Sequence, residues 1–405
     1  MMFSKTRLIP VLCLCICLLL AGCTKDEKKP TEQPTEPVTP TEVLSPTPTP
    51  EPESVVEHMT LKDRYKDVFK IGVAVSNTTM HNKEYMDIVK EQFNSFTFEN
   101  EMKPDSLLNR TACQKGLPDT DTEPVLQFIG IQNGLTIAKQ NGMGVRGHTL
   151  CWYSQTPRWF FTKDYTDSGD LCDRETMLKR LESYIKQVME FCQTEYPGVI
   201  YAWDVVNEAV DIGSGDSDGI RREKNNWYAT IGPDFIDYAF AFARKYSDGT
   251  AKLYYNDYNC YDKMASIVRV LKSVQEAGNI DGIGMQCHLG TMDSMRDRAY
   301  KAAKYFTSNG YCVQITELDI GSKTRAEGIE KLQAIRYKEL FYYVEQGVKA
   351  GEINLDSITV WGLYDEASWR TGENPLLYKR SVGKLTKKPA WYGAMQDPAI
   401  EIPQN

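Results

Sequence analysis

The sequence lacks the features that mark several common classes of protein. It has no glycine-rich loop of the kind that cradles nucleotide phosphates, and no His-Glu-x-x-His motif or comparable spacing for a metal. The net charge is −8 and the part expected to fold shows no basic cluster, so we expect no nucleic-acid partner. These absences predict a protein that uses neither a cofactor nor a metal.

Closely spaced cysteine pairs are also absent. Four of the 11 cysteines lie within the first 23 residues, and the others are spread singly along the chain. An odd number of cysteines without close pairs argues against a disulfide framework. We expect at least some of the following to be buried free thiols: Cys113, Cys151, Cys172, Cys192, Cys260, Cys287 and Cys312.

Aromatic residues are missing between Thr24 and Arg64. Eight prolines fall between positions 30 and 52, interleaved with threonine and glutamate. Such a segment buries too little apolar surface to fold and behaves as an extended spacer. We therefore predict a disordered Pro/Thr/Glu-rich linker over residues 23–54, followed by one folded domain over residues 55–405.

An export signal is predicted over residues 1–22. Lys5 and Arg7 precede an apolar run at 9–20, which is shorter than the roughly 20 residues that a membrane-spanning helix needs. The small residues before Cys23 resemble a bacterial lipoprotein processing site, and an ordinary secretory signal is the alternative. We expect a lipid on Cys23 and an exported protein, anchored to the outer face of the cell membrane or released from it by cleavage in the linker.

Strand-like runs alternate with helix-like segments through the rest of the chain. Two helical segments, at 178–192 and 267–274, show apolar residues at three- and four-residue steps. Alternating strands and helices predict a parallel sheet. Eight such units fit a closed (β/α)8 barrel, or TIM barrel, better than an open doubly wound sheet. The predicted strands are 71–75, 95–98, 144–150, 199–206, 252–255, 282–286, 311–316 and 357–361.

Unusual polar residues occur at the carboxyl ends of the predicted strands. In a (β/α)8 barrel these ends share one mouth, where active sites are built, whereas an open sheet would scatter them. We therefore expect a single site that contains Asn100, His148, Asn207, Glu208, Asn256, Gln286, His288, Glu317 and Trp361.

Two glutamates at this mouth indicate a chemistry. Glu208 ends the run WDVVNE, and Glu317 lies within ITELD. Hydrolysis of a glycosidic bond needs one carboxylic acid to protonate the departing oxygen and one carboxylate to attack or stabilise the oxocarbenium-like carbon. A single glutamate at a strand end is usually a solvated charge, but the neighbouring Asn207 and Asp319 favour catalysis here. The pair predicts a glycosidase.

Ordered motifs along the chain resemble those of family-10 glycoside hydrolases, the endo-1,4-β-xylanases of (β/α)8 fold. The resemblance covers residues 71–394, nearly the whole predicted domain. It implies an enzyme that hydrolyses internal β-1,4 bonds of xylan outside the cell. The motifs are FENEMK (98–103), RGHTL (146–150), WYSQ (152–155), WDVVNEA (203–209), NDYN (256–259), DGIG (281–284), ITELD (315–319) and WG (361–362).

The resemblance implies roles for the residues near the two glutamates. Glu208 would be the general acid and then the base, so its pKa should be raised, and Glu317 would be the nucleophile. In retaining enzymes the two carboxyl groups lie about 5 to 5.5 Å apart and the anomeric configuration is kept. Asn207 would bond to the sugar 2-hydroxyl, while His288 and Asp319 would hold Glu317 ionised.

The resemblance also implies residues that bind the sugar chain. Tryptophan faces surrounded by amide and charged groups suit the hydroxyl edges and weakly apolar faces of sugars. Trp159, Trp227 and Trp391 are instead expected in the core. The implied binding residues are Glu99, Asn100, Lys103, His148, Trp152, Gln155, Asn256, Tyr258, Gln286, Trp361 and Trp369.

Some positions depart from the family's pattern, and other functions stay open. Tyr153 stands where histidine is common and Pro104 where many relatives have tryptophan, but no catalytic group is missing.

One alternative is another two-glutamate barrel that cleaves cellulose or mixed-linkage glucan. Others are a lipoprotein that binds oligosaccharides without cleaving them, and a metal-dependent hydrolase with His148, His288 and the glutamates as ligands. We expect a monomer.

Overall fold

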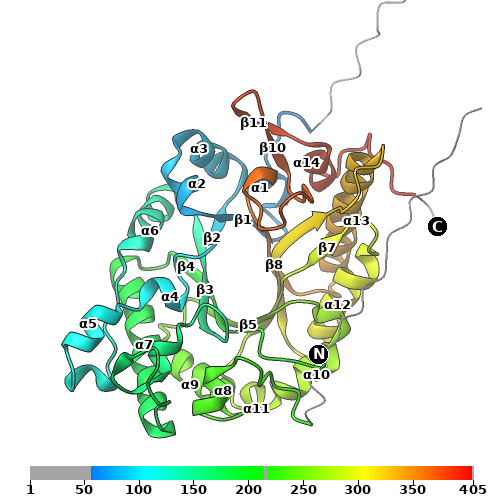
Figure 1. Ribbon diagram of the computed structural model, residues 1–405. Coiled ribbons are helices and arrows are strands. Elements are labelled where there is room, and N and C mark those ends of the chain that lie inside the picture. Colours follow the sequence, from blue (N-terminus) through cyan, green and yellow to red (C-terminus); the bar gives the residue numbers. More distant parts are fainter. Residues whose placement is uncertain (1–55, 214–216, 404–405) are drawn as a thin grey trace, which may run out of the picture. The chain divides into compact units, whose positions relative to one another are not determined.

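Eight parallel strands close into a barrel in the computed structural model, which describes residues 56–213 and 217–403 (Figure 1). The hydrogen-bonded order is β6-β5-β4-β3-β2-β1-β9-β8, and β6 pairs with β8 to close the ring. The predicted (β/α)8 fold is therefore confirmed. The strands are β1 (Lys70–Val75), β2 (Ser95–Phe98), β3 (Gly144–Trp152), β4 (Ile200–Asn207), β5 (Lys252–Asp257), β6 (Gly282–Met285), β8 (Cys312–Gly321) and β9 (Leu355–Val360).

The eight predicted strands match these eight within a few residues. The prediction missed β7 (His288–Gly290), which pairs with the outer part of β8, and the antiparallel hairpin of β10 (Tyr378–Ser381) and β11 (Lys384–Lys387). Three residues are too few to show a period, and β10 and β11 are mostly polar, with only Tyr378 buried. The missed strands lie outside the barrel wall.

Helices surround the barrel and cover its outer face (Figure 1). Apart from α1, which precedes β1, and α14, which follows β11, they fall between consecutive strands, as in other (β/α)8 barrels. Their bounds are α1 (Leu61–Tyr65), α2 (Asn77–His81), α3 (Lys83–Gln92), α4 (Pro104–Leu107), α5 (Arg110–Lys115), α6 (Ile129–Asn141), α7 (Arg174–Glu195), α8 (Asn226–Thr230), α9 (Phe235–Tyr246), α10 (Met264–Val270), α11 (Lys272–Glu276), α12 (Lys301–Ser308), α13 (Ile329–Lys349) and α14 (Pro389–Ala394).

The helix α7 shows how local sequence sets these elements. The side chain of Asp173 accepts a hydrogen bond of 2.9 Å from the backbone N–H of Thr176, which caps the first turn. Most of the predicted apolar stripe is buried, and the helix ends at Glu195, ahead of Pro197. The second predicted stripe is split into α10 and α11 around Leu271.

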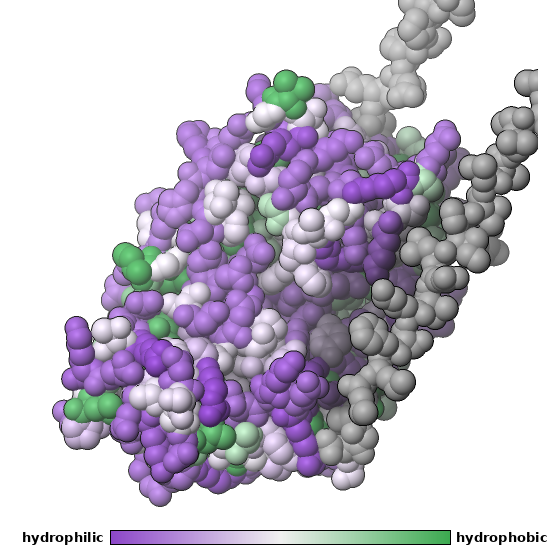
Figure 2. Space-filling view, viewed as in Figure 1, coloured by the Kyte–Doolittle hydropathy of each residue, from purple (hydrophilic) through white to green (hydrophobic). Residues whose placement is uncertain are grey.

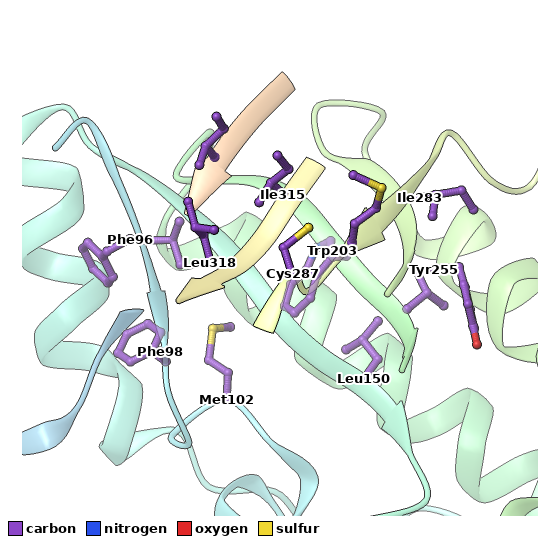
Figure 3. Close-up of a cluster of buried hydrophobic side chains, with 14 of the residues drawn as sticks. Phe96, Phe98, Met102, Leu150, Trp203, Tyr255, Ile283, Cys287, Ile315 and Leu318 are labelled. Atoms are coloured by element: carbon purple, nitrogen blue, oxygen red, sulfur yellow. The ribbon is translucent and has the colours of Figure 1, made fainter. Parts of the chain in front are cut away.

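A continuous apolar core fills the space between barrel and helices. All ten residues of β8 are buried, as expected for a strand covered on both faces. Figure 3 shows side chains of several strands meeting in this core, among them Phe96, Trp203 and Ile315. The seven cysteines among the described residues are buried and free, and Trp159, Trp227 and Trp391 are buried too, so both expectations are confirmed.

Hydrophilic residues dominate the face of the molecule seen in Figure 2, with hydrophobic residues scattered among them. Within the described residues, every helix is too short or too polar to cross a bilayer. The export signal at 1–22, the lipidation site Cys23 and the linker at 23–54 lie outside the described residues, and these predictions remain predictions.

Candidate active site

A cavity of about 520 Å³ opens at the carboxyl ends of the barrel strands. Residues from strand ends far apart in the sequence converge on it, as the barrel topology requires. Its lining consists of Glu99, Asn100, Lys103, His148, Trp152, Gln155, Asn207, Glu208, Tyr258, Asn259, Gln286, His288, Glu317, Trp361 and Trp369.

All but two of the residues predicted for the site in the folded domain line this cavity. The exceptions, Asp319 and Asn256, are fully buried beside it. Asn256 was expected to bind substrate, and that role stays a prediction. Its amide nitrogen donates to Glu317 Oε1 at 2.8 Å, so Asn256 supports the carboxylate. Asn259 lines the cavity without having been predicted as a site residue.

Glu317 on β8 is held as a carboxylate. Besides the bond from Asn256, its Oε2 lies 3.1 Å from Nε2 of His288. Burial by itself raises the pKa of Glu317, but the hydrogen bond from His288 and the positive charges of His148, His288 and Arg146 lower it to about 2. Glu317 is therefore ionised at neutral pH, which suits a nucleophile.

His288 connects Glu317 to a second buried carboxylate. Its Nδ1 lies 2.9 Å from Asp319 Oδ2, which also accepts a 3.0 Å bond from Nε1 of Trp369. Arg370 Nη1 pairs with Asp319 Oδ1 at 2.6 Å. Burial lowers the pKa of His288, but the charge of Asp319 and the hydrogen bonds to both carboxylates raise it to about 10. At neutral pH a protonated imidazole thus lies between two carboxylates.

Glu208 follows β4 directly and has different surroundings. Its carboxyl oxygens accept bonds from Nε2 of Gln286 at 2.8 Å and from Nε1 of Trp152 at 3.1 Å, and both donors are neutral. Burial raises the pKa of Glu208, the charges of Asp257 and Glu317 raise it further, and the two hydrogen bonds offset part of this rise. A carboxyl group with a raised pKa can hold a proton for a leaving group.

Asn207 is fixed at the end of β4 by its neighbour on β5. The side-chain amides of Asn207 and Asn256 are hydrogen bonded at 2.9 Å, and the hydroxyl of Thr316 donates to Asn256 Oδ1 at 2.6 Å. Thr316 and Asn207 are both almost fully buried. The arrangement holds the Asn207 amide at the cavity wall next to Glu208, where it can meet a bound sugar.

On one side of the two glutamates, Lys103 contacts several side chains that are suited to bind a sugar ring. Nζ of Lys103 donates to Asn100 Oδ1 at 3.0 Å and to Gln155 Oε1 at 2.8 Å. It also lies 5.0 Å from the centre of a Trp152 ring, within the range of a cation–π contact. Aromatic faces with fixed polar groups around them are the usual means of binding sugars in a cavity.

Below this cavity, buried polar groups hold the aromatic wall in place. His148 packs edge-on against Trp361, with ring centres 5.6 Å apart, and its Nδ1 lies 2.8 Å from Asp204 Oδ2. Asp204 also pairs with Arg146, and both side chains are inaccessible to solvent. A buried charge is tolerated only where it is paired and hydrogen bonded, so this network is a fixed part of the site.

Sequence reasoning missed Arg370, Asn259 and a third residue, Arg221, which contacts the backbone of Glu208. Arg370 follows Trp369 directly, and its place next to a predicted site residue could have indicated that it lies near the site. Asn259 lies within the motif NDYN. Arg221 lies in a long loop after β4, and nothing in its neighbours indicated where its side chain would go.

A (β/α)8 barrel whose mouth brings together one carboxyl group with a raised pKa and one with a lowered pKa defines the class of two-carboxylate glycoside hydrolases. The family model for glycosyl hydrolase family 10 matches residues 60–397. The chain therefore belongs to glycosyl hydrolase family 10.

Relatives with known names agree with this assignment. Endo-1,4-beta-xylanase B of Butyrivibrio fibrisolvens is 41% identical over 347 residues, which is 84% of this chain and 53% of that protein. Endo-1,4-beta-xylanase A of Thermotoga neapolitana is 40% identical over 79% of this chain and 29% of its own length. The chain thus spans about half, or less, of these two relatives.

Solved structures of xylanases share the fold. The N-terminal modules of an endo-1,4-beta-D-xylanase of Clostridium thermocellum, complexed with xylohexaose, superpose with a TM-score of 0.76 and are 34% identical, covering 83% of this chain and 67% of that one. An intracellular xylanase of Thermoanaerobacterium saccharolyticum superposes with a TM-score of 0.71 and is 30% identical, covering 84% of this chain and 99% of that one.

Proposed function

We propose that the chain is a retaining endo-1,4-β-xylanase that hydrolyses internal bonds of xylan by double displacement. The observation that carries the proposal is the opposite setting of its two glutamates, with a lowered pKa for Glu317 and a raised pKa for Glu208. Membership of glycosyl hydrolase family 10 and the names of the relatives support xylan as the substrate.

The first step forms a covalent intermediate. A Glu317 oxygen attacks the anomeric carbon while Glu208 gives its proton to the glycosidic oxygen, the carbon–oxygen bond breaks, and the shortened chain leaves as an alcohol. His288 and Asn256 orient the attacking carboxylate. Asn207 bonds to the sugar 2-hydroxyl, an interaction that strengthens as positive charge develops on the ring.

The second step releases the sugar. Glu208, now ionised, removes a proton from water as the water oxygen attacks the anomeric carbon, and the bond to Glu317 breaks. Two inversions return the original configuration. The Lys103 cluster with Trp152, Trp361 and Trp369 would bind the sugars that remain attached to the enzyme in the intermediate.

The substrate is tested by measuring reducing-sugar release from xylan and from carboxymethyl-cellulose. We expect a strong preference for xylan, and proton NMR of the first products should show the β-anomer before mutarotation. Equal rates on both polymers would instead favour another β-glycanase. Binding of xylo-oligosaccharides without turnover would favour a non-catalytic binding protein.

We also propose that the protein is exported, acts as a monomer and is anchored to the outer face of the cell membrane through a lipid on Cys23. The support is the sequence ahead of Cys23. Labelled fatty acid should enter the full chain and not its Cys23→Ala variant, and equal labelling of both would overturn the anchor. Light scattering on the delipidated protein should give the mass of one chain, and a twofold mass would overturn the monomer.

A further inference from the structure

Arg221 connects the acid/base glutamate to Tyr258, which follows the neighbouring strand β5. It lies between β4 and α8, and its backbone N–H donates to Ala209 O at 2.7 Å. Its side chain is only 11% exposed and does not line the cavity. A large charged side chain that is buried next to an active site without reaching it needs a structural or positioning explanation.

The guanidinium of Arg221 makes four contacts. One is an ion pair, with Nη1 lying 3.8 Å from Asp211 Oδ2, and the other three involve Glu208 and two tyrosines. Nε donates to the backbone carbonyl of Glu208 at 3.1 Å, and Nη2 donates to the hydroxyl of Tyr258 at 2.7 Å. Its central carbon lies 4.4 Å from the centre of the Tyr153 ring. Tyr258 and Glu208 both line the cavity. The fork geometry of a guanidinium fixes the positions of such partners relative to one another.

The backbone of Glu208 needs this support because it is strained. Its φ is +56°, a left-handed conformation that is unfavourable for a residue with a side chain. The peptide is held on both sides, since its N–H donates to Asn256 O at 2.9 Å and its carbonyl accepts from Arg221. Removal of the Arg221 contact would free one side, and a shift of the order of 1 Å in a reacting group can cost about 100-fold in rate.

We propose that Arg221 is a positioning residue for proton transfer to the leaving sugar. It holds the Glu208 carboxyl in line with the glycosidic oxygen and holds Tyr258 against the departing part of the chain. This inference rests on the proposed function. It adds that Arg221 determines how strongly the rate depends on the pKa of the leaving group. Arg221 touches neither the sugar nor Glu317, so formation of the bond to the nucleophile should not depend on it.

The test uses the full chain with a series of aryl β-xylobiosides whose leaving groups differ in pKa. For Arg221→Met we expect kcat/KM on xylohexaose to fall by about tenfold or more, because general acid catalysis contributes about 10² to 10⁴ in rate. On dinitrophenyl β-xylobioside, whose leaving group needs no proton, kcat/KM should stay within about threefold of the wild type. The plot of log(kcat/KM) against leaving-group pKa should therefore be steeper than for the wild type.

Arg222→Met is the matched control, because Arg222 is the next residue, is 46% exposed and pairs with Asp218. Its plot should coincide with the wild type. Tyr258→Phe removes the hydrogen bond between Arg221 and Tyr258 and should give an intermediate slope. A parallel plot for Arg221→Met, with equal losses on every substrate, would overturn the inference and leave the proposed function intact.

If Arg221→Met does not fold, as judged by thermal unfolding, Arg221→Lys takes its place with the same expectations, since lysine keeps the charge but not the fork. A steeper plot supports the positioning role and a parallel plot overturns it. A wild type that does not cleave xylohexaose would instead overturn the proposed function.

Discussion

The two glutamates of the site lie at neighbouring parts of one cavity but in opposite surroundings. Glu317 is held by a chain of charged groups that runs through His288 to Asp319 and Arg370. Glu208 is held by the neutral side chains of Gln286 and Trp152 on a strained backbone. Two residues of the same type thus acquire different protonation states from their partners, because charged partners stabilise the ionised form and burial without them disfavours it.

The largest effect is expected from removing Glu317, the glutamate with charged partners. Glu317→Ala should lower kcat on xylan by about 10⁵-fold or more, because no other group can form the covalent intermediate. Reducing-sugar release measures the loss. Glu175→Gln, at an exposed glutamate on α7, is the control and should keep full activity. A loss of less than about tenfold in Glu317→Ala would remove it from the nucleophile's role.

Removing the other glutamate should give a smaller and selective loss. Glu208→Ala should lower kcat/KM on xylan by about 10³-fold, but much less on dinitrophenyl β-xylobioside, because that leaving group needs no proton. Added azide should take the place of water and yield β-xylobiosyl azide, since the anion needs no base. An α-linked azide, or no azide product, contradicts the assignment of the two roles.

The pH dependence should separate the two surroundings further. Glu317 must be ionised and Glu208 protonated, so kcat/KM falls as pH drops through the pKa of Glu317 and as pH rises through that of Glu208. His288→Asn removes the partner that lowers the pKa of Glu317, so that pKa rises and the acid limb moves to higher pH. We expect a shift of about one pH unit or more and about a tenfold loss of kcat.

This shift is measured from kcat/KM between about pH 2 and pH 9, a range that reaches the pKa of Glu317 in the wild type. His81→Asn, at an exposed histidine on α2, should leave both limbs unchanged. An alkaline limb that moves while the acid limb stays would show that His288 acts on Glu208 instead.

The smallest effect is expected from a change next to Asp319, in the series of charged groups that begins at Glu317. Trp369→Phe keeps an aromatic face but deletes the N–H that donates to Asp319, and it should lower kcat about three- to tenfold. The Trp369 side chain is partly exposed, so water can replace part of the lost bond. Steady-state kinetics on xylohexaose measure the effect, and a loss above about 100-fold would mean that the indole does more than orient Asp319.

Much of this site followed from the sequence, for reasons that can be named. Strand ends of a (β/α)8 barrel meet at one mouth, so Glu208 and Glu317 could be placed in one site although 109 positions separate them. Their implied pKa directions agree with the structure. The separation of the two carboxyl groups expected for a retaining enzyme stays a prediction.

The parts that could not be predicted depend on side-chain direction. Asn256 is at a strand end, as expected, but it is fully buried and donates to Glu317. Arg370 and Arg221 reach the site from loops, where no period fixes the direction of a side chain. The split of one apolar stripe into α10 and α11 could not be predicted either. One continuous helix and two short helices would both bury Ile267 and Val274, so the pattern does not distinguish them.

The buried thiols have a practical consequence for measuring how often the barrel opens. Burial raises the pKa of Cys192 and of Cys287 to about 12, and the thiolate is the form that reacts with alkylating reagents. These sulfurs should react only when their part of the chain exposes them. Alkylation followed by mass spectrometry would then time the transient opening of α7 at Cys192 and of the segment beside His288 at Cys287, with the native cysteines as the only probes.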